Sequence, residues 1–223
     1  MNTNAFPLSR YNTLLQLPAG QHICQGGELS GCAWQLLDGT VRLDQNDSHR
    51  ERFVQVVLTG ELFGAEAWFG QPQSCSARTL TDCTLVRLPT PDEPLLSHWL
   101  GRALQQQIAR AADMVALRTG SAPERVRRLL LMLAPPGAHG GQDGPADHVL
   151  PRIKDIAAIV DTAPETVSRV ISSLRRSQVL NGRHARFARF DPDQLAHCTL
   201  PAGMTRSDVI GTHFRQPAAV AAS

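Results

Sequence analysis

Two short helical patterns joined by a three-residue turn constrain the fold most strongly, and they lie within residues 152–180. The first pattern, IKDIAAIV, repeats apolar residues at three- and four-residue spacing, which predicts a short helix with one apolar face. The residues DTA at 161–163 predict the turn; Thr162 can cap the second helix, and Pro164 and Glu165 suit its first turn. The apolar residues of the second helix fall within about 100° of one another, and they are Val167, Val170, Ile171 and Leu174. Two helices joined in this way predict a helix-turn-helix.

The polar face of the second helix has side chains suited to reading base edges. Arg169 can donate two hydrogen bonds to guanine, Glu165 can accept from cytosine, and Ser168 can reach either base or a thymine methyl. The alternative is an ordinary amphipathic helix with a solvated polar face. The candidate DNA-binding residues in and after this motif are Thr162, Glu165, Thr166, Ser168, Arg169, Ser172, Arg183 and Arg186.

Charge is distributed unevenly along a chain whose formal net charge is only +2. Residues 1–90 have a net charge of −2, whereas residues 152–189 have a net charge of +5. A basic block of this kind suggests a polyanionic partner for the C-terminal region. Within it, SQVLNGRHARFARFDPDQL predicts a turn and a basic β-hairpin, the wing of a winged helix, whose arginines could hold phosphates without reading sequence.

The region from Leu14 to Leu88 predicts short β-strands separated by turns. Segments such as QLPAGQ, QGGELSG, LLDGTVRL and LTGELFG place turn residues between apolar runs, including FVQVVL at 53–58 and CTLVRL at 83–88. Short strands at close, fairly even spacing indicate an all-β barrel or roll.

Residues 95–118 predict a long helix with one apolar stripe. Such a stripe can pack on the β-domain of its own chain or pair with its counterpart in a dimer. The candidate dimer-interface residues are Leu96, Leu100, Leu104, Ile108, Ala111 and Val115.

A further helix is predicted from SAPERVRRLLLML, with Ser121 as N-cap, Pro123 in the first turn and Glu124 three residues after the cap. It should end at Ala134, before PPGAHGGQDGPADH, whose Gly and Pro content predicts a loop. From about Leu200 onward no periodicity is evident, which predicts a disordered or expendable tail.

Composition and motifs exclude several classes of protein. Apolar residues make up 42% and charged residues 19%, which is typical of a soluble globular chain. No apolar run approaches the roughly 18 residues of a membrane span, and no basic stretch followed by an apolar segment marks secretion, so we expect a cytoplasmic protein without a membrane partner. No Walker loop, G-x-S-x-G or H-E-x-x-H is present, so we expect that the protein is not an enzyme.

The order of these segments resembles the CRP/FNR family of bacterial transcriptional regulators over about residues 14–197. The match is carried by QGGELSGCAWQLLDGTVRL, TGELFGAEAWF and above all IKDIAAIVDTAPETVSRVISSLRRSQVL. The resemblance implies an α+β fold: an N-terminal β-roll of the cyclic-nucleotide-binding, jelly-roll type over 1–92, a dimerisation helix over 93–119, a winged helix-turn-helix over 120–199 and a tail over 200–223. It also implies a cytoplasmic homodimer that binds a palindromic site in double-stranded DNA and contacts RNA polymerase, as activator or repressor.

The recognition helix resembles that of FNR-like members more than that of the cyclic-AMP receptor. PETVSR matches the pattern E-x-x-S-R, whereas the receptor has R-E-x-x-G-R; Pro164 and Ser168 stand at the two positions that differ. The resemblance implies that Glu165, Ser168 and Arg169 read half-sites like TTGAT rather than TGTGA.

The ligand pocket departs from the cyclic-AMP pattern of the family. Aligned without a gap, Ala65 stands at the position of the ribose-binding Glu and Cys75 at that of the phosphate-binding Arg. Without that guanidinium a cyclic phosphate loses its bidentate, charge-assisted partner, and Glu66, displaced by one residue, would add repulsion. We therefore expect that the effector is not cyclic AMP.

The five cysteines leave the nature of the signal open. No cysteine precedes Cys24, so the iron–sulfur signature of FNR-like members is missing. Four cysteines lie in the expected sensor domain in pairs separated by eight residues, Cys24 with Cys32 and Cys75 with Cys83; this spacing matches no standard zinc or cluster motif. They are either small buried residues or part of a sensor of thiol redox state, soft metal or metalloid, or haem and gas. His22 is a possible extra ligand, and Cys198 is given no role.

Two regulatory hypotheses remain at this point. In the first, a signal sensed in the β-roll changes the long-helix interface and reorients the DNA-binding domains. In the second, the regulator has lost effector control and binds DNA constitutively. The target genes are not indicated.

Overall fold

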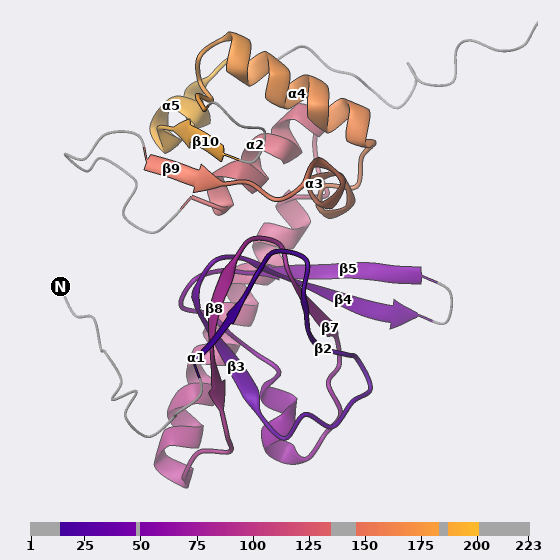
Figure 1. The fold of residues 1–223 in the computed structure, drawn as a ribbon, viewed down its shortest axis with the longest axis vertical. Helices are drawn as coiled ribbons and strands as arrows, with labels where there is room; N and C mark the ends of the chain where they lie inside the picture. The colour runs from indigo at the N-terminus through magenta and orange to yellow at the C-terminus, as the bar shows by residue number, and fades with distance from the viewer. Residues whose placement is uncertain (1–13, 48–49, 135–145, 183–186, 201–223) are drawn as a thin grey trace, which may run out of the picture.

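The computed structural model describes residues 14–47, 50–134, 146–182 and 187–200, and it shows a β-roll and a mainly helical unit connected by one long helix (Figure 1). The strands of the roll form two four-stranded antiparallel sheets, in the orders β1-β8-β3-β6 and β2-β7-β4-β5. Their bounds are β1 Leu14–Leu17, β2 His22–Cys24, β3 Ala33–Asp38, β4 Val41–Asp47, β5 Arg50–Val57, β6 Leu62–Phe63, β7 Ser76–Thr79 and β8 Cys83–Leu88. The predicted roll and the α+β class are confirmed.

Apolar side chains from alternate positions of both sheets fill the inside of the roll. Leu36 and Leu85 of one sheet meet Val41 and Val57 of the other, and all four are fully buried. The turn between β3 and β4 requires a glycine at residue 39, because its φ is 96° and a Cβ there would lie 2.7 Å from the Cys83 sulfur.

The long helix α1, Glu93–Ala116, runs behind the roll and continues to the helical unit (Figure 1). Trp99, 3% exposed, anchors it in a second core beside Trp68, whose indole N–H donates to the Leu88 carbonyl at 3.0 Å. Farther along, the side-chain amide of Gln106 both donates to and accepts from the backbone of Leu62, at 2.8 Å each. The helix therefore completes the edge of the sheet at β6.

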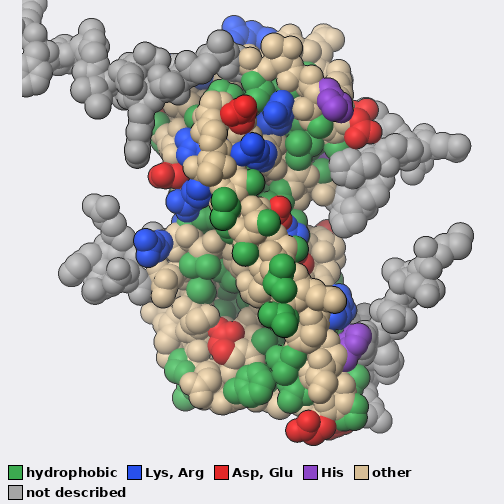
Figure 2. Space-filling model, turned by 180° about the vertical axis from the view of Figure 1, so that it is seen from behind, with side chains coloured by type: hydrophobic (Ala, Val, Ile, Leu, Met, Phe, Trp, Pro, Cys, Tyr) green, Lys and Arg blue, Asp and Glu red, His purple; other side chains and the backbone are tan. Residues whose placement is uncertain are grey.

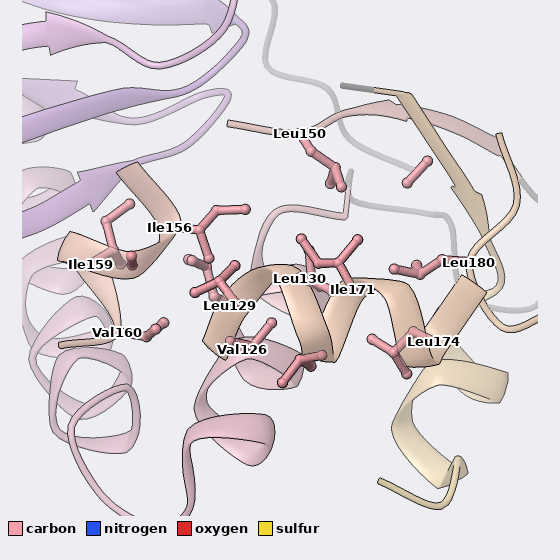
Figure 3. Packing of buried hydrophobic residues seen from close by; sticks show 14 of the residues in the cluster. Val126, Leu129, Leu130, Leu150, Ile156, Ile159, Val160, Ile171, Leu174 and Leu180 are labelled. Atoms are coloured by element: carbon pink, nitrogen blue, oxygen red, sulfur yellow. The ribbon is translucent and has the colours of Figure 1, made fainter. Parts of the chain in front are cut away.

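The C-terminal unit is the predicted helix-turn-helix with its supporting elements. It contains α2 Ala122–Met132, β9 Ala146–Val149, α3 Ile153–Ile159, α4 Pro164–Arg176, β10 Phe187–Phe190 and α5 Pro192–His197. Figure 3 shows Leu129 and Leu130 of α2 meeting Ile156 of α3 and Ile171 of α4 in its core. The predicted cap of α2 is confirmed: Ser121 donates to the Glu124 carboxylate from its N–H and its hydroxyl, at 2.8 and 2.9 Å.

Some local predictions need correction or completion. The predicted loop after α2 contains a strand, because residues 146–148 belong to β9; residues 135–145 lie outside the described part. Across the predicted wing, Asn181 and Arg189 form an antiparallel bridge, as a hairpin requires, and β10 also pairs with β9, a partner distant in sequence; residues 183–186 lie outside the described part. The apolar repeat in IKDIAAIV predicts Ile153, Ile156, Ala157 and Val160 on the buried face of α3. Ile153 is instead 36% exposed, and Ile159 is buried in addition to the other three. The predicted C-terminal tail, from 201 onward, also lies outside the described residues.

Within the described residues, none of the helices combines the length and hydrophobicity required to cross a bilayer.

Candidate DNA-binding surface and sensor pocket

Helix α4 has two faces of opposite character. Val167, Val170, Ile171 and Leu174 are each at most 5% exposed and pack into the core of the unit. Glu165, Ser168, Arg169 and Ser172 are exposed on the other side. Thr166 is partly buried and lies between these faces. The apolar stripe therefore holds α4 in the unit, and the polar row is free to enter the major groove of DNA.

The turn before α4 differs from the prediction in its capping residue. Ala163, rather than Thr162, occupies the N-cap position, and α4 has no side-chain cap. The turn forms because Asp161 adopts a left-handed φ of 49°, which Asp tolerates better than most residues, and because the Thr162 N–H donates to the Ala157 carbonyl at 3.0 Å. Thr162 is partly buried, so its role at the surface is limited to the exposed part of its side chain.

Several basic residues are exposed on α3, α4 and β10. Arg152 and Lys154 are exposed at the start of α3, Arg176 at the end of α4, and Arg189 on β10. The predicted phosphate contacts Arg183 and Arg186 lie outside the described residues. Figure 2 shows that Lys and Arg side chains also occur on the rear face of the upper unit, opposite to the view of Figure 1. This distribution provides the positive potential that phosphate binding requires.

The apolar stripe of α1 divides into two parts. Leu96 and Leu100 are partly buried against the roll of their own chain, which leaves only part of each side chain for the predicted dimer interface. Leu104, Ile108 and Val115 are 63%, 65% and 65% exposed, and Ala111 is also exposed. Figure 2 shows hydrophobic side chains following the face behind the strands, where this helix runs. The outer part of α1 is thus an apolar row without cover within the described chain.

A small cavity of about 180 Å³ lies between the roll and α1. Its walls come from β4, β5, the segments around η2 (Ala65–Phe69) and β7, and from one residue of α1; they are Leu43, Val54, Gln55, Phe63, Gly64, Glu66, Gln73, Ser74, Cys75 and Gln107. No Arg or Lys is among these lining residues, and Glu66 places a carboxylate in the wall. Ala65, at the position of the family's ribose-binding Glu, packs instead against the second core. The cavity is thus polar, uncharged except for an acid, and smaller than the roughly 300 Å³ at which ligand pockets begin.

The cysteines belong to the inner core of the roll rather than to a ligand cluster. Cys24, Cys32 and Cys83 are buried, Cys75 packs beside them half-buried, and all four are free thiols. Among the described residues, no three His, Cys, Asp or Glu side chains are grouped so that they could hold a metal ion. His22 is exposed on the strand that carries Cys24.

Burial also makes three of these thiols poor nucleophiles. It raises the pKa of Cys24 to about 12 and raises the pKa of Cys75 and of Cys83. The Cys83 sulfur donates to the carbonyls of Thr40 and Thr81 at 3.3 Å each, as expected of a protonated thiol. Because the thiolate is the reactive form, this environment disfavours fast oxidation or metal capture.

Sequence reasoning missed the amides that line the cavity and the contacts between the two units. Gln55, Gln73 and Gln107 converge on the cavity from β5, the loop before β7 and α1. Gln107 belongs to the run QQQ at 105–107, and this polar run within the helical pattern is its local signal in the sequence. The ion pair between Arg78 and Asp155, 77 residues apart, has no local signal.

Comparisons with known proteins agree with this architecture. A model of the cyclic nucleotide-binding domain matches residues 14–92, and a model of the Crp-like helix-turn-helix domain matches residues 124–198. The transcriptional regulator SdrP of Thermus thermophilus is 31% identical over 71% of this chain and 79% of its own length. The cyclic AMP receptor protein of the same organism is 30% identical over 73% of this chain and 77% of its own length.

A solved structure shows the same arrangement of elements. It is a transcriptional regulator of the CRP/FNR family from Thermus thermophilus, which superposes with a TM-score of 0.62 at 25% identity, over 82% of this chain and 96% of its own. With a cyclic-nucleotide-binding-type roll, a connecting helix and a Crp-like helix-turn-helix in this order, the chain belongs to the CRP/FNR family of transcriptional regulators.

Proposed function

We propose that this DNA-binding regulator acts as a homodimer that reads a palindromic promoter site with Glu165, Ser168 and Arg169 of α4. The observation that carries the proposal is the polar row of α4, which is exposed along a helix whose opposite face is fully packed. The exposed basic residues would contact phosphates and set the register, while the row reads base edges. Contacts with RNA polymerase would follow from this placement at a promoter.

The dimer in this proposal is formed by the outer part of α1. Leu104, Ile108, Ala111 and Val115 recur at three- and four-residue spacing and remain uncovered. Two such rows can bury each other as in a coiled coil. Two copies of the helix-turn-helix would then present their recognition helices to successive major grooves, about one helical turn apart.

The pattern E-x-x-S-R favours half-sites like TTGAT over half-sites like TGTGA. The test is fluorescence anisotropy of the purified protein with two labelled duplexes that carry one or the other palindrome, at one fixed salt concentration because affinity depends on salt. The proposal requires tighter binding to the TTGAT palindrome than to the TGTGA palindrome and to a scrambled duplex. Equal affinity for all three would overturn it.

In this proposal residues 1–92 form the sensor domain, residues 93–119 the dimerisation helix and residues 120–199 the DNA-binding domain. The effector is a signal other than cyclic AMP. The absence of Arg and Lys from the cavity wall and its small volume support this exclusion. The candidate signals are thiol redox state, a metal or metalloid, haem or a gas, and a small ligand.

A second candidate is a regulator that binds DNA without an effector. It is favoured by the small cavity and by the raised pKa of three sensor-domain thiols, which leave little chemistry for a signal. DNA affinity measured on reduced, oxidised and metal-treated protein separates the two: equal values support the second candidate, and a change in one sample supports the first.

A further inference from the structure

Asp155 is a buried carboxylate in the helix that supports the recognition helix. It lies on α3, its side chain is 5% exposed, and its Oδ1 accepts a hydrogen bond from Arg78 Nη2 of β7 at 2.8 Å. The Arg78 side chain is itself only 18% exposed. A buried charge that loses its partner keeps its desolvation cost without compensation. Separation of the β-roll from the helical unit would therefore cost electrostatic free energy.

The surroundings of Arg78 strengthen this dependence. On the neighbouring strand β4, Arg42 lies directly opposite Arg78 in the sheet register. Like charges at such positions repel, and each arginine is neutralised by a different acid. Arg42 pairs with Asp44 of its own sheet at 2.6 Å, whereas Arg78 pairs with Asp155 of the helical unit. Of these two arginines, Arg78 is thus the one whose acidic partner comes from the helix-turn-helix.

Apolar contacts also hold the roll and the helical unit together, but they do not fix the angle between them. Phe53 and Val56 of β5 and Leu80 after β7 belong to the same buried cluster as Ile156 and the rest of the helical core. Figure 1 shows α3 as the helix of the upper unit that faces β5. Hydrophobic contact is non-directional and tolerates rotation, whereas a hydrogen-bonded ion pair fixes an angle.

We propose that Arg78 and Asp155 are positioning residues that fix the orientation of the helix-turn-helix on the β-roll and thereby set the half-site spacing that the dimer accepts. This inference rests on the proposed dimeric reading of a palindrome. One added base pair turns the second half-site by about 35° around the DNA axis and moves it about 3.4 Å along that axis. A helix-turn-helix with a fixed orientation loses affinity for DNA when the spacing changes. A helix-turn-helix that can rotate on its roll keeps most of its affinity.

The experiment measures affinity for a series of palindromes whose spacers differ by one base pair. Wild type is expected to prefer one spacer over its neighbours by about tenfold. Asp155→Asn keeps the shape of the side chain and removes its charge, and it should flatten this preference to about threefold or less. Arg78→Gln should flatten it to the same extent, and the double variant should add nothing further, because both changes remove one contact.

Asp92→Asn is the matched control, because Asp92 is exposed and makes no side-chain capping bond. It should keep the wild-type spacer profile. A general loss of folded protein lowers the active fraction equally for every spacer and leaves the profile unchanged, and circular dichroism monitors this loss separately. A wild-type profile in well-folded Asp155→Asn protein overturns the inference.

Hydrogen exchange on the protein without DNA separates this inference from the proposed function. Segments 50–57 and 153–159 should exchange faster in Asp155→Asn than in wild type, while β8, which lies in the other sheet of the roll, should not change. If wild type binds no palindrome, the proposed function fails and this exchange still decides whether the pair holds the units together. Unchanged exchange at both segments means that it does not.

Discussion

The carboxylate of Glu66 accepts two hydrogen bonds from Ser74, one from the backbone N–H and one from the hydroxyl, each at 2.7 Å. Both residues line the cavity of the roll. An acid of the protein thus occupies donors that an anionic ligand would otherwise use at this wall. The contact also ties η2 to the loop before β7 and narrows the space between them.

Cyclic AMP should fail to bind this protein. Its phosphate would meet the Glu66 carboxylate and no guanidinium among the lining residues, so its charge would be desolvated without compensation. Isothermal titration calorimetry should show no binding heat, and the ligand should leave DNA affinity unchanged. A saturable isotherm with a measurable shift in DNA affinity would show that the cavity reorganises around the nucleotide.

Arg169→Ala should remove base recognition. The loss should be roughly 1–3 kcal/mol per half-site for the specific palindrome, with little change for scrambled DNA, because a side chain that reads a base edge adds specificity rather than general affinity. The measurement is anisotropy with both duplexes. Arg176→Ala, on the same helix, is the control and should leave the ratio of the two affinities unchanged. An unchanged ratio in Arg169→Ala protein would remove Arg169 from the reading face.

Leu104→Glu combined with Ile108→Glu should separate the subunits. The two side chains are 63% and 65% exposed in one chain, and charges there would be buried without partners in a dimer. Analytical ultracentrifugation should show a smaller sedimentation coefficient and anisotropy a weaker affinity for the palindrome. Gln105→Glu adds a charge beside this row and should behave as wild type. A dimeric double variant would place the interface elsewhere.

Stability should fall as the pH rises above 9, in part because of Cys24. Burial raises the pKa of this thiol in the folded protein from 9.0 to about 12, whereas the unfolded chain ionises near the lower value. The stabilising difference is complete below pH 9 and is lost as the pH rises toward 12, at about 1.4 kcal/mol per pH unit for one thiol. Denaturant unfolding of Cys24→Ala protein should show a weaker alkaline dependence than Cys198→Ala protein. Equal slopes would mean that the thiol is accessible to solvent.

The helix-turn-helix was predictable because its information is local. The period of Val167, Val170, Ile171 and Leu174 specifies which face of α4 is buried, and the structure has the same face in the core. The roll was predictable for a similar reason, since turn residues and short apolar runs alternate along the chain.

Contacts between segments distant in sequence could not be predicted. Strand β9 follows a Gly-rich stretch and forms by pairing with β10, about forty residues later. The burial of the apolar stripe of α1 depends on where the roll ends along the helix, since Leu100 is partly buried and Leu104 is exposed. The cavity amides and the pair of Arg78 with Asp155 depend on the packing of whole elements, which no short window contains.

The sheet β2-β7-β4-β5 separates the cavity of the roll from the core of the helical unit. Gln55 faces the cavity, while its chain neighbour Val56 packs with the core of the helical unit. On β4, Leu43 lines the cavity, while its neighbour Arg42 pairs with Asp44. Backbone atoms are common to both sides, so a strand displaced by an occupant of the cavity carries its outer side chains with it. A displacement of β4 or β5 would therefore reach the core of the helical unit through one layer, without a relay of intermediate side chains.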